Sequence, residues 1–160
     1  AVVPQGAAGR GSTLFVDFHT TKPISPAEHC HLNAMVADTQ QWEQSAAFLL
    51  DRHPGVLRWV KNDRLGFFVP YRNRGVPARY LPDFIAVTDS GLNVILEIKG
   101  QYNDNADVKA KAAERWVAGV NRLGGHGEWR YVVVTDPGRV AETINTFTTA
   151  QWSEGPFTLS

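Results

Sequence analysis

The stretch at residues 80–100, YLPDFIAVTDSGLNVILEIKG, decides the fold that this sequence predicts. Residues 80–88 are rich in aromatic and β-branched side chains and predict a strand, residues 89–91 predict a turn, and residues 92–98 predict a second, strongly apolar strand. Charged side chains do not belong in such strands without a reason. Asp83 nevertheless lies inside the first predicted strand, and the second runs into Glu97-Ile98-Lys99.

The alternation of side chains along a strand brings these charges together. Glu97 and Lys99 point to the same face, roughly 7 Å apart along the strand, and pairing of the two strands as a hairpin would place Asp83 near Glu97. Two partly buried carboxylates repel each other and resist ionisation unless a cation compensates them. Mg²⁺, a hard ion that prefers oxygen ligands, is a natural compensator. The simpler alternative is a Glu97–Lys99 ion pair at a strand exit with an unrelated aspartate nearby.

Length and composition indicate one globular domain. The chain has 160 residues, of which 43% are hydrophobic, and no run of eighteen apolar residues that could span a membrane. Its first residues lack the pattern of a signal peptide and an initiator Met, so we expect a piece of a longer chain. A single cysteine, Cys30, excludes an internal disulfide and fits a reducing compartment.

The charge balance limits how the domain can meet nucleic acid. Sixteen basic residues balance sixteen acidic ones, so the whole domain does not attract DNA electrostatically. Any contact with DNA therefore needs a local basic patch or a partner module. The most basic stretch, residues 72–79, predicts a loop whose Arg72, Arg74 and Arg79 could hold phosphates. A solvated loop explains these arginines equally well.

The N-terminal third predicts a linker, a strand, a loop and a helix. We expect residues 1–12 to be a flexible lead or linker and residues 13–160 to be the domain, with a strand at 14–18 and a loop at 20–31. Residues 28–31, Glu-His-Cys-His, carry metal-ligand types without a second ligand pair, so a surface loop is favoured over a zinc site. An extended run at 32–37 then leads to the helix.

A capping box formed by Asp38 and Gln41 predicts the start of that helix, which should stop near residues 53–55. Glu43 lies at the margin of its apolar face and could reach the sheet; the alternative is an exposed glutamate favoured by the helix dipole. The predicted buried face consists of Trp42, Ala46, Leu49 and Leu50.

The rest of the chain predicts further strands and one long helix. Strands are expected at 56–61, 64–71 and 129–135, and a helix at 106–123 is followed later by a short helix ending near 147. Lys109 and Lys111 lie off the apolar stripe of the long helix, where they either contact DNA or only solubilise it. That stripe consists of Val108, Ala112, Trp116, Gly119, Val120 and Leu123. This order of elements predicts an α/β sandwich with a mixed central sheet flanked by helices.

Several motifs resemble those of a known nuclease superfamily. Pro82-Asp83, thirteen further residues and then Glu97-Ile98-Lys99 match the PD-(D/E)xK signature, and Glu43 stands where that superfamily carries an acidic residue on its first core helix. Over roughly residues 14–135, the sequence resembles the C-terminal endonuclease domain of type III restriction enzymes. It lacks the Q-x-x-x-Y element of the RecB-like branch of the superfamily. The segments that carry this resemblance are DTQQWE (38–43), VKNDRL (60–65), VPY (69–71), YLPDF (80–84), LEIKG (96–100) and WVAGVN (116–121).

The resemblance implies a restriction-endonuclease-like fold and Mg²⁺-dependent cleavage of double-stranded DNA, with Mn²⁺ able to substitute. Asp83, Glu97 and the backbone carbonyl of Ile98 would hold the metal, Glu43 would hold a metal-bound water or a second ion, and Lys99 would orient the attacking water. The products would carry 5′-phosphate and 3′-hydroxyl ends. The implied partners are a helicase-like ATPase region of the same chain and a methyltransferase subunit, in the cytoplasm of a prokaryotic cell.

Two other functions fit part of the same sequence. The same site could serve a transposase subunit or a repair nuclease, with the same chemistry and another partner. Alternatively, the sheet could belong to a nucleic-acid or protein interaction module that has lost catalysis. The presence of Glu43, Asp83, Glu97 and Lys99 together counts against an inactive module, because binding alone needs no buried acidic cluster.

Overall fold

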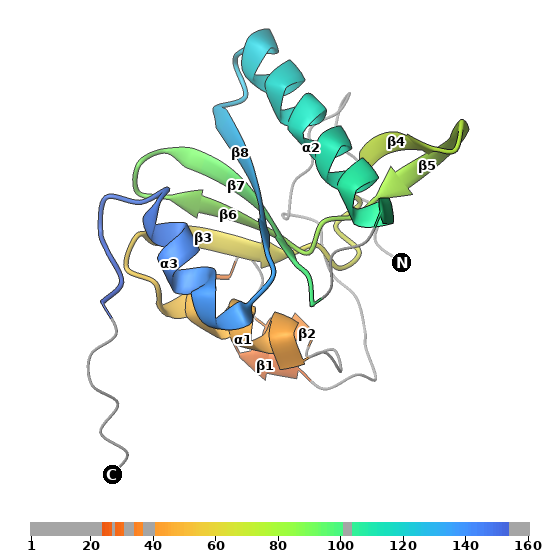
Figure 1. Cartoon of the computed structure of the whole chain (residues 1–160). Helices are drawn as coiled ribbons and strands as arrows, with labels where there is room; N and C mark the ends of the chain where they lie inside the picture. The colour runs from red at the N-terminus through yellow and green to blue at the C-terminus, as the bar shows by residue number, and fades with distance from the viewer. Residues whose placement is uncertain (1–23, 27, 31–33, 37–40, 101–103, 154–160) are drawn as a thin grey trace.

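A mixed four-stranded sheet forms the centre of the protein (Figure 1). The computed structural model describes residues 24–26, 28–30, 34–36, 41–100 and 104–153. The sheet order is β3-β6-β7-β8, in which β3–β6 and β6–β7 are antiparallel and β7–β8 is parallel. The strands are β3 (Val56–Lys61), β6 (Phe84–Thr88), β7 (Leu92–Ile98) and β8 (Glu128–Val134). The predicted mixed α/β architecture is therefore confirmed.

Helices cover both faces of this sheet. Figure 1 shows α2 (Asp104–Leu123) on one face, and α1 (Gln41–Arg52) and α3 (Val140–Asn145) on the other. Parallel strands need a long crossover connection, and α2 provides it between β7 and β8. A 3₁₀ turn, Pro137–Arg139, leads from β8 into α3.

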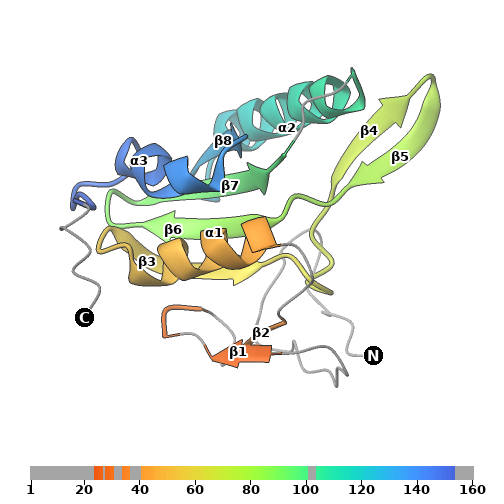
Figure 2. The ribbon, with the colours of Figure 1, turned by 60° about the horizontal axis from the view of Figure 1, so that its bottom comes forward.

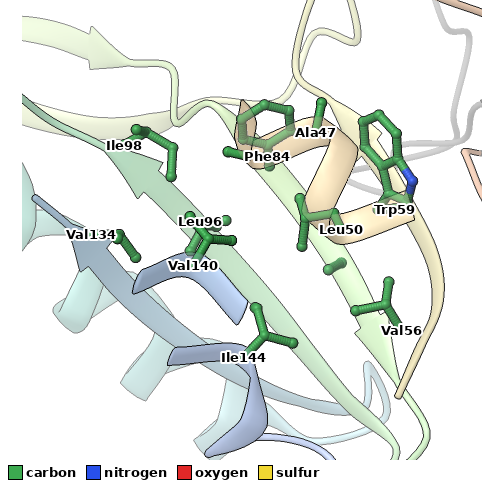
Figure 3. Close-up of a cluster of buried hydrophobic side chains, with 12 residues drawn as sticks. Ala47, Leu50, Val56, Trp59, Phe84, Leu96, Ile98, Val134, Val140 and Ile144 are labelled. Atoms are coloured by element: carbon green, nitrogen blue, oxygen red, sulfur yellow. The ribbon is translucent and has the colours of Figure 1, made fainter. Parts of the chain in front are cut away.

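The larger hydrophobic core lies between the sheet and helices α1 and α3. In Figure 3, Leu50 of α1 and Val140 and Ile144 of α3 lie over Leu96 of β7, and all four side chains are fully buried. Leu96 and Ile98 both point to this face, because alternate residues of β7 share a side of the sheet. Trp42, predicted to be buried, is 39% exposed. Gly100 lies close to the Trp42 ring, because a Cβ atom there would come within 3.1 Å of it, so the first turn of α1 stands beside the end of β7.

A second cluster packs on α2, and here the predicted stripe is only partly right. Ala112 is buried and Trp116 half-buried as expected, but Val108 is 36% exposed and Leu123 is 75% exposed. The buried face is instead made largely of small side chains, which let the helix approach the sheet closely: Ala106, Ala110, Ala112, Ala113 and Val117. Gly124 and Gly125, both with positive φ, end the helix as predicted.

The segment between β3 and β6 differs most from expectation. The predicted strand at 64–71 is interrupted because Arg64 and Gly66 have positive φ, and the chain becomes extended only at β4 (Val69–Asn73). The predicted basic loop at 72–79 is wrong: β4 pairs with β5 (Val76–Tyr80) as an antiparallel hairpin. Figure 2 shows this hairpin projecting beyond the four-stranded sheet.

The predicted strand at 80–88 is split into two. Tyr80 closes β5, and β6 begins only at Phe84, so Asp83 precedes the strand instead of lying inside it. Pro82 has no N–H group for the sheet, which favours a break here. The buried side chain of Asn62 holds the break in place by donating to the Pro82 carbonyl at 2.9 Å, while its backbone N–H donates to the Asp83 carbonyl at 2.8 Å.

The N-terminal part of the described chain forms a small separate ladder. β1 (Ile24–Pro26) pairs with β2 (Ala34–Val36), so the predicted loop at 20–31 is wrong at residues 24–26. Glu28 and His29 are exposed as expected for a surface loop, and both of their backbone N–H groups donate to the Asp51 carboxylate. The expectations for residues 1–12, for the strand at 14–18, for His31 and for the Asp38 cap lie outside the described residues.

The end of α1 is fastened by a buried histidine. The His53 side chain is fully buried: Nδ1 accepts the Gly55 N–H at 3.0 Å, and Nε2 lies 2.9 Å from Asn145 Oδ1. Because Nδ1 is the acceptor, Nε2 carries the proton and the imidazole is neutral, and burial lowers its pKa. This histidine joins α1 to α3. None of the described helices is both long enough and apolar enough to cross a membrane.

Candidate functional site

The strand register brings Asp83 and Glu97 side by side. Phe84 of β6 pairs with Leu96 of β7 in an antiparallel ladder, so Asp83, one residue before Phe84, comes opposite Glu97. The Asp83 Oδ2 atom accepts the backbone N–H of Ile98 at 2.8 Å. The expected proximity of the two carboxylates is therefore present, although Asp83 reaches its place from the turn before β6.

Both carboxylates carry the electrostatic cost of this proximity. Burial, followed by the charge of Glu97, raises the pKa of Asp83 to about 7, against a weaker opposing effect from the Ile98 N–H. Burial also raises the pKa of Glu97, whose side chain is largely inaccessible, although Tyr80, Lys99 and Lys109 each act in the opposite direction. When both carboxylates are ionised, the surrounding protein groups therefore do not fully compensate their negative charge.

Lys99 lies on the same side of β7 as Glu97, as the strand alternation predicts. Its Nζ atom is 3.9 Å from Glu97 Oε1, and its side chain is 21% exposed. This distance is at the outer limit of an ion pair and is too long for a hydrogen bond. The ammonium group therefore remains near the carboxylates with donor capacity that Glu97 does not use.

Glu43 approaches the pair from α1 but is held by another lysine. Its Oε2 atom forms an ion pair with Lys61 Nζ at 2.8 Å, at the end of β3. The charge of Glu43 still contributes to the raised pKa of Asp83, and that of Lys61 lowers it. Glu43 thus lies at the margin of the site, as expected, and is neither fully exposed nor in direct contact with Asp83. No motif or spacing in the sequence indicated Lys61 as its partner.

Tyr80 and Tyr131, which the sequence did not indicate, and Lys109, which it offered only as a DNA contact, lie at or next to Glu97. The Tyr80 hydroxyl donates to Glu97 Oε2 at 2.8 Å, and the Tyr131 hydroxyl lies 3.1 Å from that of Tyr80. Lys109 of α2 lies over the Tyr80 ring, 5.6 Å from its centroid. Lys109 was expected on the open face of its helix; the structure places it half-buried against the site. The only signal in the sequence that could have indicated Tyr80 is its position two residues before the Pro-Asp motif.

The other expected DNA-binding residues lie on the β4–β5 hairpin and on α2. Cross-strand neighbours share a face, so Arg72 (paired with Pro77) and Arg79 (paired with Pro70) lie on one face of the hairpin, and Val69 and Tyr80 lie on the other. Arg79 stacks on the Phe68 ring at 4.5 Å, and Arg72 donates to the Gly75 carbonyl at 2.9 Å.

Arg74 occupies the hairpin turn, with a positive φ of 49°. Lys111 forms an exposed ion pair with Asp107 on α2 at 2.7 Å. Contact of any of these residues with DNA stays a prediction.

The chemistry of the carboxylate pair suits a hard divalent cation. Asp83 and Glu97 offer anionic oxygens in a largely buried place where a cation would relieve their repulsion. Within the described residues, however, no three or more His, Cys, Asp and Glu side chains are arranged to hold a metal ion. Mg²⁺ usually binds through one or two carboxylates and completes its shell with water and substrate phosphates, so two carboxylates are enough to fit it.

Comparisons with known proteins assign no relative to the chain. No protein-family model matches it, and neither do curated proteins or solved structures.

The raised pKa of Asp83 predicts how the metal-free protein responds to loss of this charge. A carboxyl group whose pKa is raised on folding lowers the free energy of unfolding as the pH rises from the pKa of the unfolded chain, 3.8, to that of the folded protein, about 7. Asp83→Asn keeps an acceptor for the Ile98 N–H and removes the charge. In EDTA at pH 8 we expect this variant to have a free energy of unfolding higher than that of wild type by up to about 4 kcal/mol, with the gain shrinking towards pH 4. Urea unfolding at several pH values measures this.

A matched control is Glu114→Gln on the exposed side of α2, which should leave the pH dependence of stability unchanged. An Asp83→Asn variant that is less stable than wild type at pH 8 would contradict the proposed repulsion. Mg²⁺ should then stabilise the wild-type protein and leave Asp83→Asn unaffected, because only the former retains both carboxylates.

Proposed function

We propose that this chain is a Mg²⁺-dependent DNA endonuclease domain of the PD-(D/E)xK type, and that it is the cleavage domain of a type III restriction-modification enzyme. The observation that carries the proposal is the convergence of Asp83, Glu97 and Lys99 at one end of the β6–β7 pair, where the two carboxylates lack full compensation. Mn²⁺ should replace Mg²⁺. The double-stranded DNA substrate, the attached ATPase region, the methyltransferase partner and the prokaryotic cytoplasm are part of this proposal.

The order of elements around the site supports the superfamily assignment. A helix with an acidic residue, α1 with Glu43, precedes the antiparallel pair β6–β7 that carries the signature, and α2 with the parallel strand β8 follows. We infer a restriction-endonuclease-like sandwich from this arrangement. The β4–β5 hairpin is inserted between the first two strands of the sheet.

Each residue of the site has a distinct task in the proposed hydrolysis. Asp83, Glu97 and the Ile98 carbonyl would hold the metal ion, with Glu43 on the α1 side holding a bound water. When bound, Mg²⁺ neutralises negative charge that develops on the attacking and leaving oxygens of the phosphodiester. Glu43 can take this part only if Lys61 shares or releases its carboxylate.

Lys99 orients the nucleophile. An ammonium group beside a water molecule favours its deprotonated form, and Lys99 Nζ is not engaged at hydrogen-bonding distance by Glu97. The water oxygen attacks phosphorus, the bond to the 3′ oxygen breaks, and the leaving oxygen takes up a proton. This yields a 5′-phosphate and a 3′-hydroxyl.

The β4–β5 hairpin is the best-placed element for holding DNA on a chain with no net charge. Residues 69–80 contain three arginines and no acidic residue. Arg72 and Arg79 share the face of the hairpin turned away from α2, and the hairpin projects beyond the four-stranded sheet (Figure 2). We infer that this face contacts phosphates, with Arg74 at the tip and Lys111 on α2 as further contacts.

Lys99→Ala tests the catalytic assignment. We expect the variant to fold normally and to lose Mg²⁺-dependent cleavage of supercoiled plasmid by at least about 100-fold, because the attacking water loses its orienting group. Circular dichroism and a plasmid-nicking assay measure both results. Arg122→Ala is the control and should cleave normally, because Arg122 is exposed in the last turn of α2, towards the start of β7 and away from Lys99 at its end. Undiminished nicking by Lys99→Ala would refute the assignment.

Arg72→Ala/Arg79→Ala tests the hairpin. In a Lys99→Ala background, which prevents cleavage, the double substitution should weaken binding to a short duplex uniformly across sequences. The slope of log affinity against log salt should fall by about 0.9 for each phosphate that the variant no longer neutralises. Fluorescence anisotropy at several salt concentrations measures this, with Arg122→Ala again as control. An unchanged salt slope would exclude the hairpin as a phosphate-binding element.

A further inference from the structure

Tyr80 reaches the site from the inserted hairpin. It is the last residue of β5, is only 2% exposed and packs among the residues beneath α2, including Val69 and Ala113. Its hydroxyl donates to Glu97 Oε2 at 2.8 Å in a buried hydrogen bond. A buried phenol needs a polar partner, and this one takes the carboxylate that the proposed function uses as a metal ligand.

The hydrogen bonds around Tyr80 have a fixed direction. A tyrosine hydroxyl has one hydrogen, and that of Tyr80 goes to Glu97. The Tyr131 hydroxyl, 3.1 Å from that of Tyr80, must therefore be the donor in the second bond. The chain runs from Tyr131 on β8 through Tyr80 to Glu97 on β7, and each bond in such a chain strengthens the next.

The two oxygens of Glu97 consequently have different surroundings. Oε2 is engaged by Tyr80, whereas Oε1 faces Lys99 at 3.9 Å. Lys109 adds a positive charge behind the Tyr80 ring, which further favours the ionised carboxylate. The arrangement partly offsets the burial that raises the pKa of Glu97, and it leaves Oε1 on the side of Lys99.

We propose that Tyr80, supported by Tyr131, is a positioning residue that orients the Glu97 carboxylate for divalent cation binding. This inference rests on the proposed function. Hydrogen-bonded partners of a ligating carboxylate typically account for about 10- to 100-fold of metal affinity. The two faces of the hairpin then have different roles. Arg72 and Arg79 on the outer face contact DNA, and Tyr80 on the inner face bonds to Glu97.

Mn²⁺ binding to the purified protein tests the inference without relying on activity. Calorimetry should show about tenfold weaker Mn²⁺ binding for Tyr80→Phe than for wild type, and a smaller loss for Tyr131→Phe. Tyr71→Phe is the matched control, since Tyr71 lies on the same hairpin face and its hydroxyl bonds to none of the described residues. Its Mn²⁺ affinity should equal that of wild type.

A second readout separates orientation from simple destabilisation. Plasmid cleavage by Tyr80→Phe should recover to the wild-type maximum rate when Mg²⁺ is raised about tenfold, because the missing hydrogen bond weakens metal binding and leaves Lys99 in place. If Tyr80→Phe does not fold, the graded loss in Tyr131→Phe decides instead.

The outcomes distinguish this inference from the proposed function. Mn²⁺ binding that is lost in Asp83→Asn but unchanged or tighter in Tyr80→Phe would overturn the positioning role and leave the nuclease assignment standing. Wild-type protein that binds Mn²⁺ no better than Asp83→Asn would overturn both.

Discussion

The repulsion between Asp83 and Glu97 is the constraint around which the site is built. The antiparallel register of β6 and β7 forces the two carboxylates together, and burial strengthens the effect enough to raise the pKa of both. Such a pair costs folding free energy in the metal-free protein. The remaining features of the site either reduce this cost, as Tyr80 and the Ile98 N–H do, or prepare the place for a compensating cation.

The fold supplies these features from elements far apart in the chain. The Pro82 break, secured by Asn62, sets Asp83 beside β7 without placing it in the ladder. The inserted hairpin brings Tyr80, β8 brings Tyr131, and α1 brings Glu43 together with its partner Lys61 on β3. Because the hairpin also carries Arg72 and Arg79 on its other face, its packing against α2 links the proposed DNA contact to the carboxylates.

The sequence predicted those parts that depend on local periodicity and missed those that depend on three-dimensional packing. Strand β7, its turn and the Asp83–Glu97 proximity followed from alternation over a short apolar hairpin. The β4–β5 pairing was missed because positive φ at Arg64 and Gly66 shifts the start of the strand. The buried face of α2 was misjudged because alanines carry its close packing, and Lys109 was accordingly placed on the open face.

A crystal structure of the wild-type protein soaked in Mn²⁺, with anomalous diffraction data, tests the central claim most directly. We predict an anomalous peak bound by the carboxylates of Asp83 and Glu97, with Tyr80 still hydrogen-bonded to Glu97. A structure at saturating Mn²⁺ with no peak there, and with Asp83 unchanged in position, would contradict this claim.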